Sequence, residues 1–474
     1  MKVLFCTSEA TPFAASGGLG DVSSALPSAL RDRVVGCRVV MPLYEDIAEE
    51  FRHKMSFVTS ITVPVSWRRQ YCGIFEAKQG KVTYYFIDNQ YYFKRHGLYG
   101  YYDDAERFAF FSRAILEMLP AIGFFPDIIH CNDWQTALVP TYLSLFYRQI
   151  PRYGNIKTVM TIHNIQYQGK YGMEILEDVL GIPLDQKPLL EYSGDVNILK
   201  GGIETAQMVT TVSPTYSREI LDPWFSYGMH DILKLRSWKL HGIVNGIDTK
   251  GYDPENDERI FAPFSAEDMT GKKKNKAELQ KAMGLPQNPD VALVGMVSRL
   301  VGHKGFDLVK YAFEELMQSE IQLVMLGSGE WVFESFFDEM AQKYPGKFAL
   351  HTGFDVSLAH KIYAASDLFL MPSKSEPCGL SQMIAMRYGA VPVVRETGGL
   401  KDTVTDCGDG KGNGFTFKTY NAGDMTGAIY RGLSLYYNDR EGFEELQKRV
   451  MLCDNSWKRS AGEYIKLYKS LLSQ

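Results

Sequence analysis

Short apolar runs alternate with amphipathic helical stretches along almost the whole chain, and this alternation is the feature that most constrains the fold. The run Val3-Leu4-Phe5-Cys6 predicts a buried strand, and residues 19–30 predict a helix. The same order returns around strands expected at 127–130 and 158–162, with a helix expected between them over 136–147. Because strands that alternate with helices build parallel sheets, the sequence predicts an α/β fold with a doubly wound parallel sheet.

The alternation weakens once, between residues 245 and 285, where glycines, prolines and lysines accumulate. It then restarts, with strands expected at 291–298 and 368–371 and helices between them. A chain of 474 residues is also too long for one ordinary core. We therefore expect two domains, residues 1–245 and residues 246–454.

Composition narrows the possible partners. The formal net charge is −5 and there is no basic tail, so we expect no nucleic-acid partner, and we interpret the run Lys272-Lys273-Lys274 as solvated surface. No signal peptide and no long apolar run is present, so we expect no membrane partner. Seven scattered cysteines without a C-x-x-C spacing are typical of reduced thiols in the cytoplasm.

A glycine-rich turn, Ser16-Gly17-Gly18-Leu19-Gly20-Asp21, leads from the first expected strand into the first helix. Gly17 and Gly18 let a ligand approach the backbone, and the free N–H groups of the helical turn that includes Asp21 favour an anion. A tight turn without a ligand is the alternative. The dinucleotide pattern G-x-G-x-x-G is not met.

Cations and a second glycine turn follow strands of the second half. Arg299 ends one expected strand and Lys304 opens a helix, so the two could clamp a pyrophosphate and stabilise the charge of a phosphate leaving group. A pair of surface cations is the alternative. Gly398 and Gly399 again join a strand to a helix.

The loop over 372–380 carries Glu376 at its tip, where a carboxylate can accept hydrogen bonds from sugar hydroxyls. Cys378, Gly379 and Leu380 then lead into a helix, and the N–H groups of its first residues could meet a phosphate. An ordinary first-turn acid, favoured by the helix dipole, is the alternative for Glu376.

Polar residues also follow strands of the first half. His163 and Asn164 end one expected strand, and Asp133 with Trp134 ends another. An aspartate beside a tryptophan suits sugar binding, because the ring can pack on the sugar while the carboxylate takes hydroxyls. A structural role is the alternative for His163, and a simple turn is the alternative for Asn245.

Several catalytic patterns are missing from the sequence. It contains no D-x-D triplet, no H-E-x-x-H, no G-x-S-x-G elbow and no Walker loop. We therefore expect metal-independent chemistry without a cofactor, in which Arg299 and Lys304 replace a metal cation.

Taken together and in order, these segments resemble glycosyltransferase family 5, the bacterial glycogen and plant starch synthases. The resemblance covers nearly the whole chain. It rests on Ser8-Glu9 with the early Gly-Gly-Leu turn and on the segments Asp103–Phe108, His130–Trp134, Thr161–Asn164, Lys200–Ile203, Thr211–Tyr216, Val244–Asp248, Arg299–Lys304, Glu376–Leu380 and Arg395–Val404.

The resemblance implies a GT-B fold, with two Rossmann-like domains facing a deep cleft and a last helix, here 455–474, that crosses back to the first domain. It implies retaining transfer of glucose from ADP-glucose to the non-reducing end of an α-1,4-glucan. In such enzymes the first domain handles the glucan and the second binds the nucleotide sugar. A front-face mechanism, in which the leaving phosphate helps to deprotonate the incoming hydroxyl, is favoured for this fold.

The resemblance also implies roles for the matching residues. His163 would lie beside the transferred glucose, and Asp133, Asn245 and Glu376 would contact its hydroxyls. The diphosphate would be bound by Arg299 and Lys304, with help from Gly18 and from the N–H groups near Gly379 and Leu380.

The sequence departs from the family pattern at a few positions. The family usually has a lysine two residues before the Gly-Gly-Leu turn, where this chain has Ala15, and the segment Ser226–Met229 differs from the usual Gly-Glu-Gly-Leu. A transferase or epimerase that uses another nucleotide sugar, such as UDP-glucose, is therefore one alternative. A non-catalytic glucan-binding relative is another.

Overall fold

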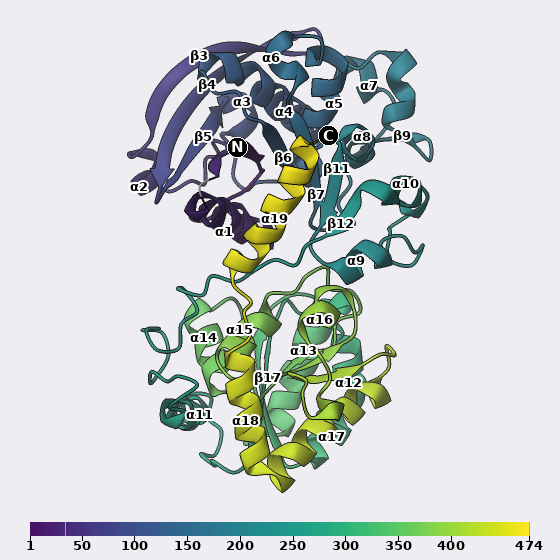
Figure 1. Ribbon diagram of the computed structural model, residues 1–474. Helices are drawn as coiled ribbons and strands as arrows, with labels where there is room; N and C mark the ends of the chain where they lie inside the picture. Colours follow the sequence, from purple (N-terminus) through teal and green to yellow (C-terminus); the bar gives the residue numbers. More distant parts are fainter. Residues whose placement is uncertain (34, 474) are drawn as a thin grey trace. The chain divides into compact units, whose positions relative to one another are not determined.

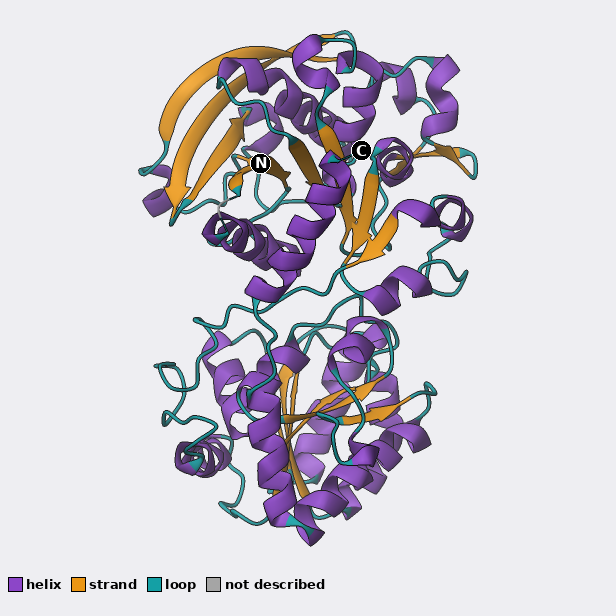
Figure 2. Ribbon diagram, viewed as in Figure 1, coloured by secondary structure: helices purple, strands orange, loops and turns teal. Residues whose placement is uncertain are grey.

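The computed structural model describes residues 1–33 and 35–473, which form two compact units. Unit 1 comprises residues 1–212, 217–243 and the last helix from Trp457 onward, whereas unit 2 comprises 213–216 and 244–456. Each unit is a β-sheet with helices on both faces (Figures 1 and 2). Both units are therefore the α/β layers that the alternation predicts.

Unit 1 contains a nine-stranded sheet of order β12-β11-β7-β6-β1-β2-β5-β4-β3. Strands β2 to β5 lie on one side of β1, and the chain then crosses to β6 on the other side. The direction of winding therefore reverses between β1 and β6. The strands are β1 (Lys2–Cys6), β2 (Gly36–Pro42), β3 (Ser56–Val65), β4 (Arg68–Gln79), β5 (Val82–Asp88), β6 (Ile128–Asn132), β7 (Lys157–Ile162), β11 (Met208–Thr211) and β12 (Leu240–Gly242).

Strand β4 runs antiparallel to β3 and β5, whereas every other neighbouring pair in this sheet is parallel. Only Ser66 and Trp67 separate β3 from β4. A connection this short joins antiparallel strands, because a parallel connection needs a crossover of about a dozen residues or more. The turn lengths, rather than the apolar runs, therefore set the direction of β4.

Helices and a small second sheet complete unit 1. Where the sequence predicts one helix over 136–147, the chain forms a 3-10 turn, a short α-helix and a π-turn in succession. The helices are α1 (Gly18–Asp32), α2 (Glu49–Arg52), α3 (Gln90–Phe93), α4 (Asp104–Ala121), α5 (Leu138–Tyr142), α6 (Pro151–Gly154), α7 (Ile175–Asp178), α8 (Ile198–Thr205), α9 (Pro214–Glu219, shared with unit 2), α10 (His230–Leu235) and α19 (Trp457–Leu472). The small sheet consists of β8 (Lys170–Tyr171), β9 (Glu191–Tyr192) and β10 (Asp195–Asn197).

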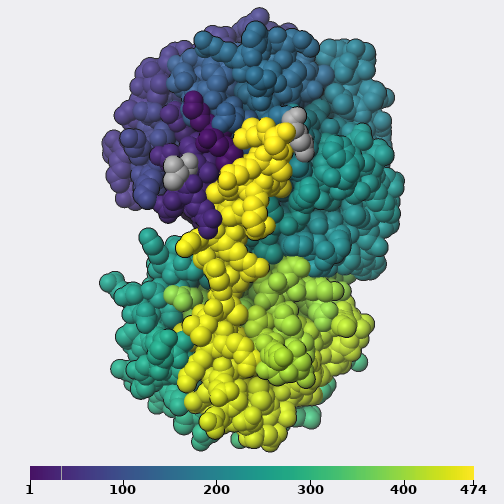
Figure 3. All heavy atoms as spheres, in the orientation of Figure 1, coloured from purple at the N-terminus to yellow at the C-terminus, as the bar shows by residue number. Residues whose placement is uncertain are grey.

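Helix α19 lies on the surface of unit 1 (Figure 3, yellow) and is held by a buried polar chain. The Tyr468 hydroxyl lies 2.6 Å from Nδ1 of His130, whose Nε2 lies 2.5 Å from Oγ1 of Thr161. Thr161 in turn meets Thr210 at 2.5 Å. Burial lowers the pKa of His130 to about 3, so the ring is neutral. This series of hydrogen bonds ties α19 to β6, β7 and β11, three adjacent strands of the sheet.

Unit 2 contains a wholly parallel sheet of order β15-β14-β13-β16-β17-β18, in which the winding reverses between β13 and β16. The strands are β13 (Ala292–Val297), β14 (Ile321–Gly327), β15 (Phe348–Thr352), β16 (Leu368–Met371), β17 (Val391–Arg395) and β18 (Phe415–Phe417). The helices are α11 (Thr270–Ala282), α12 (Phe306–Gln318), α13 (Trp331–Lys343), α14 (Val356–Ala365), α15 (Ser381–Arg387), α16 (Gly398–Thr403), α17 (Ala422–Asn438) and α18 (Arg440–Met451).

The lysine-rich stretch is part of this core, and the interpretation of Lys272 as solvated surface is wrong. The stretch forms α11, and Nζ of Lys272 is buried, where it donates to the carbonyls of Ala364 and Tyr388. Burial lowers the pKa of Lys272 to about 7. A helix has an inner and an outer face, so neighbouring lysines meet opposite environments.

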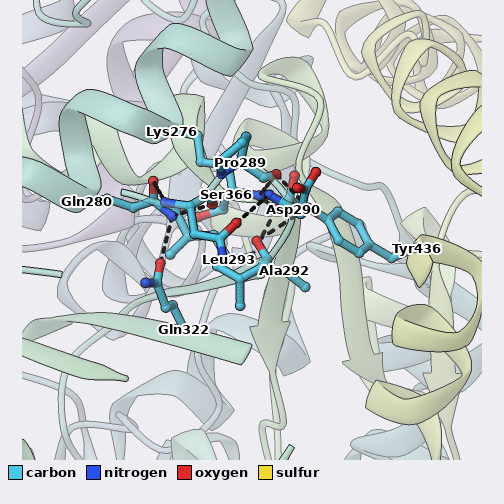
Figure 4. Close-up of polar contacts among 12 residues, drawn as sticks. Lys276, Gln280, Pro289, Asp290, Ala292, Leu293, Gln322, Ser366 and Tyr436 are labelled. Atoms are coloured by element: carbon cyan, nitrogen blue, oxygen red, sulfur yellow. Dashed lines mark hydrogen bonds and ion pairs between the residues drawn. The ribbon is translucent and has the colours of Figure 1, made fainter. Parts of the chain in front are cut away.

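One turn further along α11, Lys276 stands at the centre of a buried polar cluster (Figure 4). Its Nζ donates to Oδ2 of Asp367 at 2.8 Å, to the Tyr436 hydroxyl at 2.7 Å and to the Pro289 carbonyl at 3.0 Å. The same Asp367 oxygen accepts the backbone N–H of Leu293. All three ammonium protons are thus used, and the cluster joins α11 to the sheet.

Among the described residues, no helix is both long enough and apolar enough to cross a lipid bilayer.

We expect Lys276→Met to lower the free energy of unfolding of unit 2 by about 3–5 kcal/mol, because it leaves the buried Asp367 carboxylate without its cation. The matched control is Lys273→Met on the same helix. Lys273 is exposed and meets Glu444 at 3.0 Å, so its loss should cost less than about 1 kcal/mol. Urea unfolding followed by circular dichroism measures both, and equal losses would contradict the assignment.

Candidate active site

In unit 1 the predicted site residues gather at the carboxyl ends of β1, β6 and β7, three neighbouring strands of the sheet. Gly17 and Gly18 follow β1, Asp133 follows β6, and His163 with Asn164 follows β7. The winding reverses beside β1, and open α/β sheets bind ligands at such a reversal. The order of the strands therefore assembles one polar site from three distant segments.

Asp133 and His163 are joined directly. Oδ1 of Asp133 accepts the backbone N–H of His163 at 2.7 Å, and Nε2 of His163 lies 2.8 Å from Oδ1 of Asn132. The Asn132 oxygen accepts a hydrogen bond, so Nε2 of His163 carries the proton. Asn164 folds its own side chain onto the backbone N–H of Gln166 at 3.0 Å.

Burial shifts both titratable groups toward their neutral forms. The pKa of Asp133 is raised to about 7, although the backbone N–H groups of His163 and Asn164 oppose the shift. The pKa of His163 is lowered to about 3. Asp133 also adopts φ of 54°, an uncommon conformation for a residue other than glycine. Strain of this kind is concentrated at functional positions.

The glycine turn after β1 is organised by Glu9, a residue to which the sequence assigned no role. Its Oε2 accepts the backbone N–H of Ser16 at 2.6 Å and the Ser16 hydroxyl at 2.8 Å, and burial raises its pKa. No heavy atom lies within 4 Å of the place where a Cβ on Gly17 or Gly18 would stand. The backbone of this turn is thus open to a ligand, and Ala15 beside it is exposed.

Helix α1 begins at Gly18 and includes Asp21 in its first turn. Asp21 is exposed and is the acidic residue of that turn. Its charge compensates the positive end of the helix, so we do not place it against a phosphate.

Unit 1 has an aromatic groove beside Asp133, since the next residue, Trp134, lines it. Its volume is about 530 Å³, and the backbone of Gly169 packs against the Trp134 indole on its floor. Gln168 donates to the carbonyl of Tyr227 at 3.1 Å, which fixes the 226–229 segment as part of the wall. The lining residues are Trp134, Gln166, Tyr167, Gln168, Gly169, Lys170, Tyr171 and Tyr227.

In unit 2 the predicted residues also follow the carboxyl ends of adjacent strands, here β13, β16 and β17. Nζ of Lys304 lies 2.6 Å from Oε2 of Glu376, which also accepts the Ser373 hydroxyl at 3.1 Å. Arg299 is exposed on the loop after β13. The ion pair therefore brings together the loops that follow β13 and β16.

Glycines make this close approach of loops possible. Gly305, next to Lys304, has φ of 83°, and a Cβ there would lie 2.1 Å from the Pro372 carbonyl. Gly398 has φ of 45°, and a Cβ there would lie 1.9 Å from the carbonyl of Glu376. Gly399 donates its N–H to that carbonyl at 3.2 Å. Only glycine fits at such positions, so these turns fix the Glu376 loop from two sides.

The segment Cys378–Leu380 precedes the helix rather than starting it, since α15 begins at Ser381 with Leu380 as its N-cap residue. The Cys378 thiol is buried, and burial raises its pKa to about 12, although the nearby backbone of Asn245 opposes the shift. Oδ1 of Asn245 is also buried and has no partner among the described residues. Asn245 therefore lies beside the 378–380 segment with an acceptor that a ligand hydroxyl can use.

Two exposed aromatic residues at this edge were not predicted from the sequence. Phe354 follows β15 with 91% of its surface exposed, and Trp331 follows the neighbouring strand β14 with 78% exposed. The backbone N–H of Gly353 bonds to Gly327, which ties the two loops. Phe354 could have been found from the sequence, because an apolar residue directly before Asp355, the N-cap of α14, stands where loops are normally polar.

Comparison with family models defines the class of protein. Residues 2–235 match the starch synthase catalytic domain, and residues 276–449 match the glycosyl transferases of group 1. The fold is thus that of a two-domain glycosyltransferase. Among the described residues, no three His, Cys, Asp or Glu side chains are grouped so that they could hold a metal ion.

Full-length relatives then identify the family. The glycogen synthase of Geobacillus thermodenitrificans is 50% identical, over 100% of this chain and 98% of the relative, and that of Clostridium acetobutylicum is 48% identical over 100% of both chains. The catalytic domain of starch synthase IV from Arabidopsis thaliana, solved with ADP and acarbose, superposes with a TM-score of 0.91 at 36% identity, over 100% and 99% of the two chains. The chain belongs to the glycogen synthase family.

A sucrose-phosphate synthase from Thermosynechococcus elongatus shares the fold alone, with a TM-score of 0.61 at 17% identity over 100% of this chain and 99% of the other.

The raised pKa of Asp133 predicts a particular dependence of stability on pH. The folded protein holds this proton up to about pH 7, whereas an ordinary aspartate has a pKa of 3.8, so the stabilising contribution is complete below pH 3.8 and is lost as the pH rises through about 7. Asp133→Asn keeps the acceptor for the His163 N–H and does not titrate. We therefore expect the variant to gain stability relative to the unchanged protein between pH 5 and pH 8, measured as the shift in Tm. A constant difference would contradict the burial of this carboxyl.

Proposed function

We propose that this protein elongates an α-1,4-glucan by transferring glucose, with retention, from ADP-glucose to the non-reducing end of the chain. Full-length similarity to glycogen synthases supports the reaction. The observation that carries the residue assignment is the contact between Lys304 and Glu376 at the carboxyl edge of the unit 2 sheet. This contact supports a role for Lys304 as a cation for the diphosphate and for Glu376 as a carboxylate for the sugar.

Unit 2 supplies the groups for the diphosphate. Lys304 and Arg299 offset its negative charge, and the N–H groups at Gly379 and Leu380, just before α15, donate to phosphate oxygens. Gly18 adds an open backbone N–H at the start of α1. Phe354 offers an exposed ring on which the adenine can stack.

Acceptor atoms supply the contacts to the glucose. Asp133, Asn245 and Glu376 each present oxygens that can accept hydrogen bonds from hydroxyls. Asn245 is the clearest case, because its buried Oδ1 lacks a partner among the described residues. Cys378, Gly398 and Gly399 hold the loop of Glu376 and the position of Asn245 rather than contact the sugar.

His163 acts as a neutral hydrogen-bonding group. With a pKa of about 3 it carries no charge at neutral pH, so it cannot serve as an imidazolium acid. Its proton lies on Nε2, held toward Asn132, which leaves Nδ1 as an acceptor. The imidazole can therefore orient a hydroxyl beside the reacting carbon without donating a full proton.

The proposed step needs no protein nucleophile. The bond between C1 of glucose and the β-phosphate oxygen breaks, and O4 of the terminal glucan residue bonds to C1 on the same face. The O4 proton passes to the departing phosphate oxygen. Lys304 and Arg299 stabilise the charge that grows on this oxygen, which is the largest electrostatic demand of the step.

The aromatic groove of unit 1 is the proposed binding surface for the glucan. Tyr167 and Tyr227, which are about half exposed, offer rings to the apolar faces of glucose units, while Gln166 and Lys170 offer polar contacts at the rim. The 226–229 segment forms part of this wall, so its unusual sequence acts on the acceptor rather than on the donor.

Radiolabelled ADP-glucose supplied with glycogen tests the function. Label in the polymer supports the proposal. Label in a small product, or transfer only from UDP-glucose, would replace it with a transferase that uses another sugar nucleotide or acceptor. Glycogen binding without release of ADP would replace it with a non-catalytic glucan-binding protein. These alternatives are tested because this chain has Ala15 where the family usually has a lysine.

We expect Lys304→Ala and Glu376→Gln each to lower kcat at least tenfold, because one charged hydrogen bond is worth about 1.5–3 kcal/mol and about 1.4 kcal/mol corresponds to a factor of ten. Steady-state rates with ADP-glucose and glycogen measure the effect. Lys343→Ala is the matched control, since Lys343 also pairs with a glutamate, Glu314, but lies on the exposed surface. Unchanged rates in both site variants, with the fold intact, would remove the assignment.

We expect Ala15→Lys to lower KM for ADP-glucose, because it restores a cation beside the open turn at Gly17 and Gly18. Ala15 is exposed, so the longer side chain fits without repacking. Ala15→Gln has a similar length without the charge and serves as the control. Equal KM values for the two variants would mean that charge at this position does not reach the donor.

A further inference from the structure

Asn132 is the last residue of β6, and its polar side chain is completely buried. The sequence gives it no role of its own. The amide lies where three strands end, since it contacts Cys6 at the end of β1 and His163 directly after β7. A buried amide with a partner on each side must direct its donor and its acceptor correctly, because either one left unpaired is costly.

The carbonyl of Cys6 decides which way the Asn132 amide points. Nδ2 of Asn132 donates to this carbonyl at 2.9 Å and lies 3.5 Å from the carbonyl of His130. Backbone carbonyls only accept hydrogen bonds, so a reversed amide would bring two oxygens together and lose the bond. The amide nitrogen therefore faces β1, and Oδ1 faces the imidazole of His163, 2.8 Å from Nε2.

The backbone of Asn132 is held as firmly as its side chain. Its N–H donates to Oγ1 of Thr136 at 2.6 Å, and the Thr136 hydroxyl donates to the Asn132 carbonyl at 2.8 Å. Asn132 also pairs with Thr161 in the ladder between β6 and β7. The amide oxygen thus stands at a fixed place beside the His163 ring.

A neutral imidazole carries one N–H, and Asn132 determines which nitrogen has it. Because Oδ1 only accepts, the proton lies on Nε2 and the lone pair of the ring lies on Nδ1. Nδ1 makes no hydrogen bond with the described residues, and the His163 side chain is partly exposed. The fold therefore keeps one acceptor atom of this ring available to a ligand.

Within residues 1–33 and 35–473, no other neighbour exerts this control. Oδ1 of Asp133 accepts the backbone N–H of His163 rather than a ring N–H. His130 interacts with His163 electrostatically, but its own ring nitrogens are bonded to Tyr468 and Thr161. The hydrogen bond to Asn132 is thus what distinguishes the two ring nitrogens of His163.

We propose that Asn132 is a positioning residue for the transfer of glucose, which holds His163 as the Nε2–H tautomer so that Nδ1 accepts a hydrogen bond from a substrate hydroxyl. The proposal rests on the proposed function, which supplies the substrate and the reaction. Asn132 acts through the imidazole, because its remaining side-chain contacts end on backbone carbonyls. Without it, part of the His163 population would present an N–H where an acceptor is needed.

The first experiment is a double-mutant cycle with Asn132→Leu and His163→Ala. Leucine approximates the shape of asparagine but can neither donate nor accept, so both imidazole tautomers become possible. We expect Asn132→Leu alone to lower kcat about tenfold, as the loss of one hydrogen bond in the transition state predicts, and to change KM for ADP-glucose less than about twofold. In the His163→Ala background the same change should alter kcat less than about twofold. Additive losses in kcat would overturn the proposal.

Thr210→Val is the matched control for the cycle. Thr210 is equally buried in the same sheet and bonds to Thr161, and none of its described contacts involves His163. Its replacement removes a buried hydrogen bond, so Tm should fall while kcat stays within about twofold of the unchanged protein. An equal loss of kcat would mean that loosening the sheet is enough to slow the reaction, and would also overturn the proposal. Thermal unfolding verifies that each variant folds, and Asn132→Ala, the smaller change, replaces a leucine variant that does not.

The second experiment observes the tautomer directly and needs no turnover. Histidine labelled with 15N in the ring is incorporated, and the His163 signals among the nine histidines are those missing from His163→Ala. At pH 7 the unchanged protein should show a protonated Nε2 and an unprotonated Nδ1. In Asn132→Leu the two signals should move toward each other as the tautomers mix.

An unchanged Nε2–H tautomer in Asn132→Leu would overturn the proposal whatever the rates, and this spectrum decides where the rates of the His163→Ala variants are too low to compare. A mixed tautomer in a protein that transfers no glucose from ADP-glucose would support the control of His163 by Asn132 and refute the proposed reaction. The two failures are therefore distinguishable.

Discussion

The direction of parallel strands is the constraint on which both units depend. Neighbouring strands of a parallel ladder end at the same edge, so loops that are distant in sequence meet there. In unit 1 this brings Asp133, after β6, to His163, after β7, with 2.7 Å between carboxylate and backbone N–H. In unit 2 it brings Lys304 to Glu376, which are 72 residues apart in the sequence and 2.6 Å apart in space. Neither contact exists without the order of strands beneath it.

The two edges differ in charge. The edge of unit 1 is built around Glu9 and Asp133, whose pKa values burial raises, and a histidine kept neutral. The edge of unit 2 presents Arg299 and Lys304. In the proposed function, Arg299 and Lys304 of unit 2 supply the cations for the diphosphate. Ala15 leaves the glycine turn of unit 1 without a positive charge.

The departures from the family pattern at Ala15 and 226–229 lie in turns and loops of unit 1 rather than in its helices or strands. Ala15 lies beside the open turn, and the 226–229 segment forms part of the groove wall. The buried polar clusters around Lys276 and His130 are less tolerant of substitution. Lys276 uses all its protons inside unit 2, and His130 joins α19 to three strands of unit 1. A change in either of these clusters would leave a buried polar group unpaired.

The sequence by itself determined the α/β class, the position of most strands and helices, and which loops follow strands, because these depend on local periodicity. It also supplied Glu376, Lys304, Asp133 and His163 as polar residues after apolar runs. Only the tertiary structure decided that Lys272 is buried, that Glu9 folds the glycine turn, and that Asn132 is oriented by the carbonyl of Cys6, 126 residues away. The physical reason is that burial and pairing depend on which segments the sheet order brings together, and a local pattern carries no record of its distant neighbours.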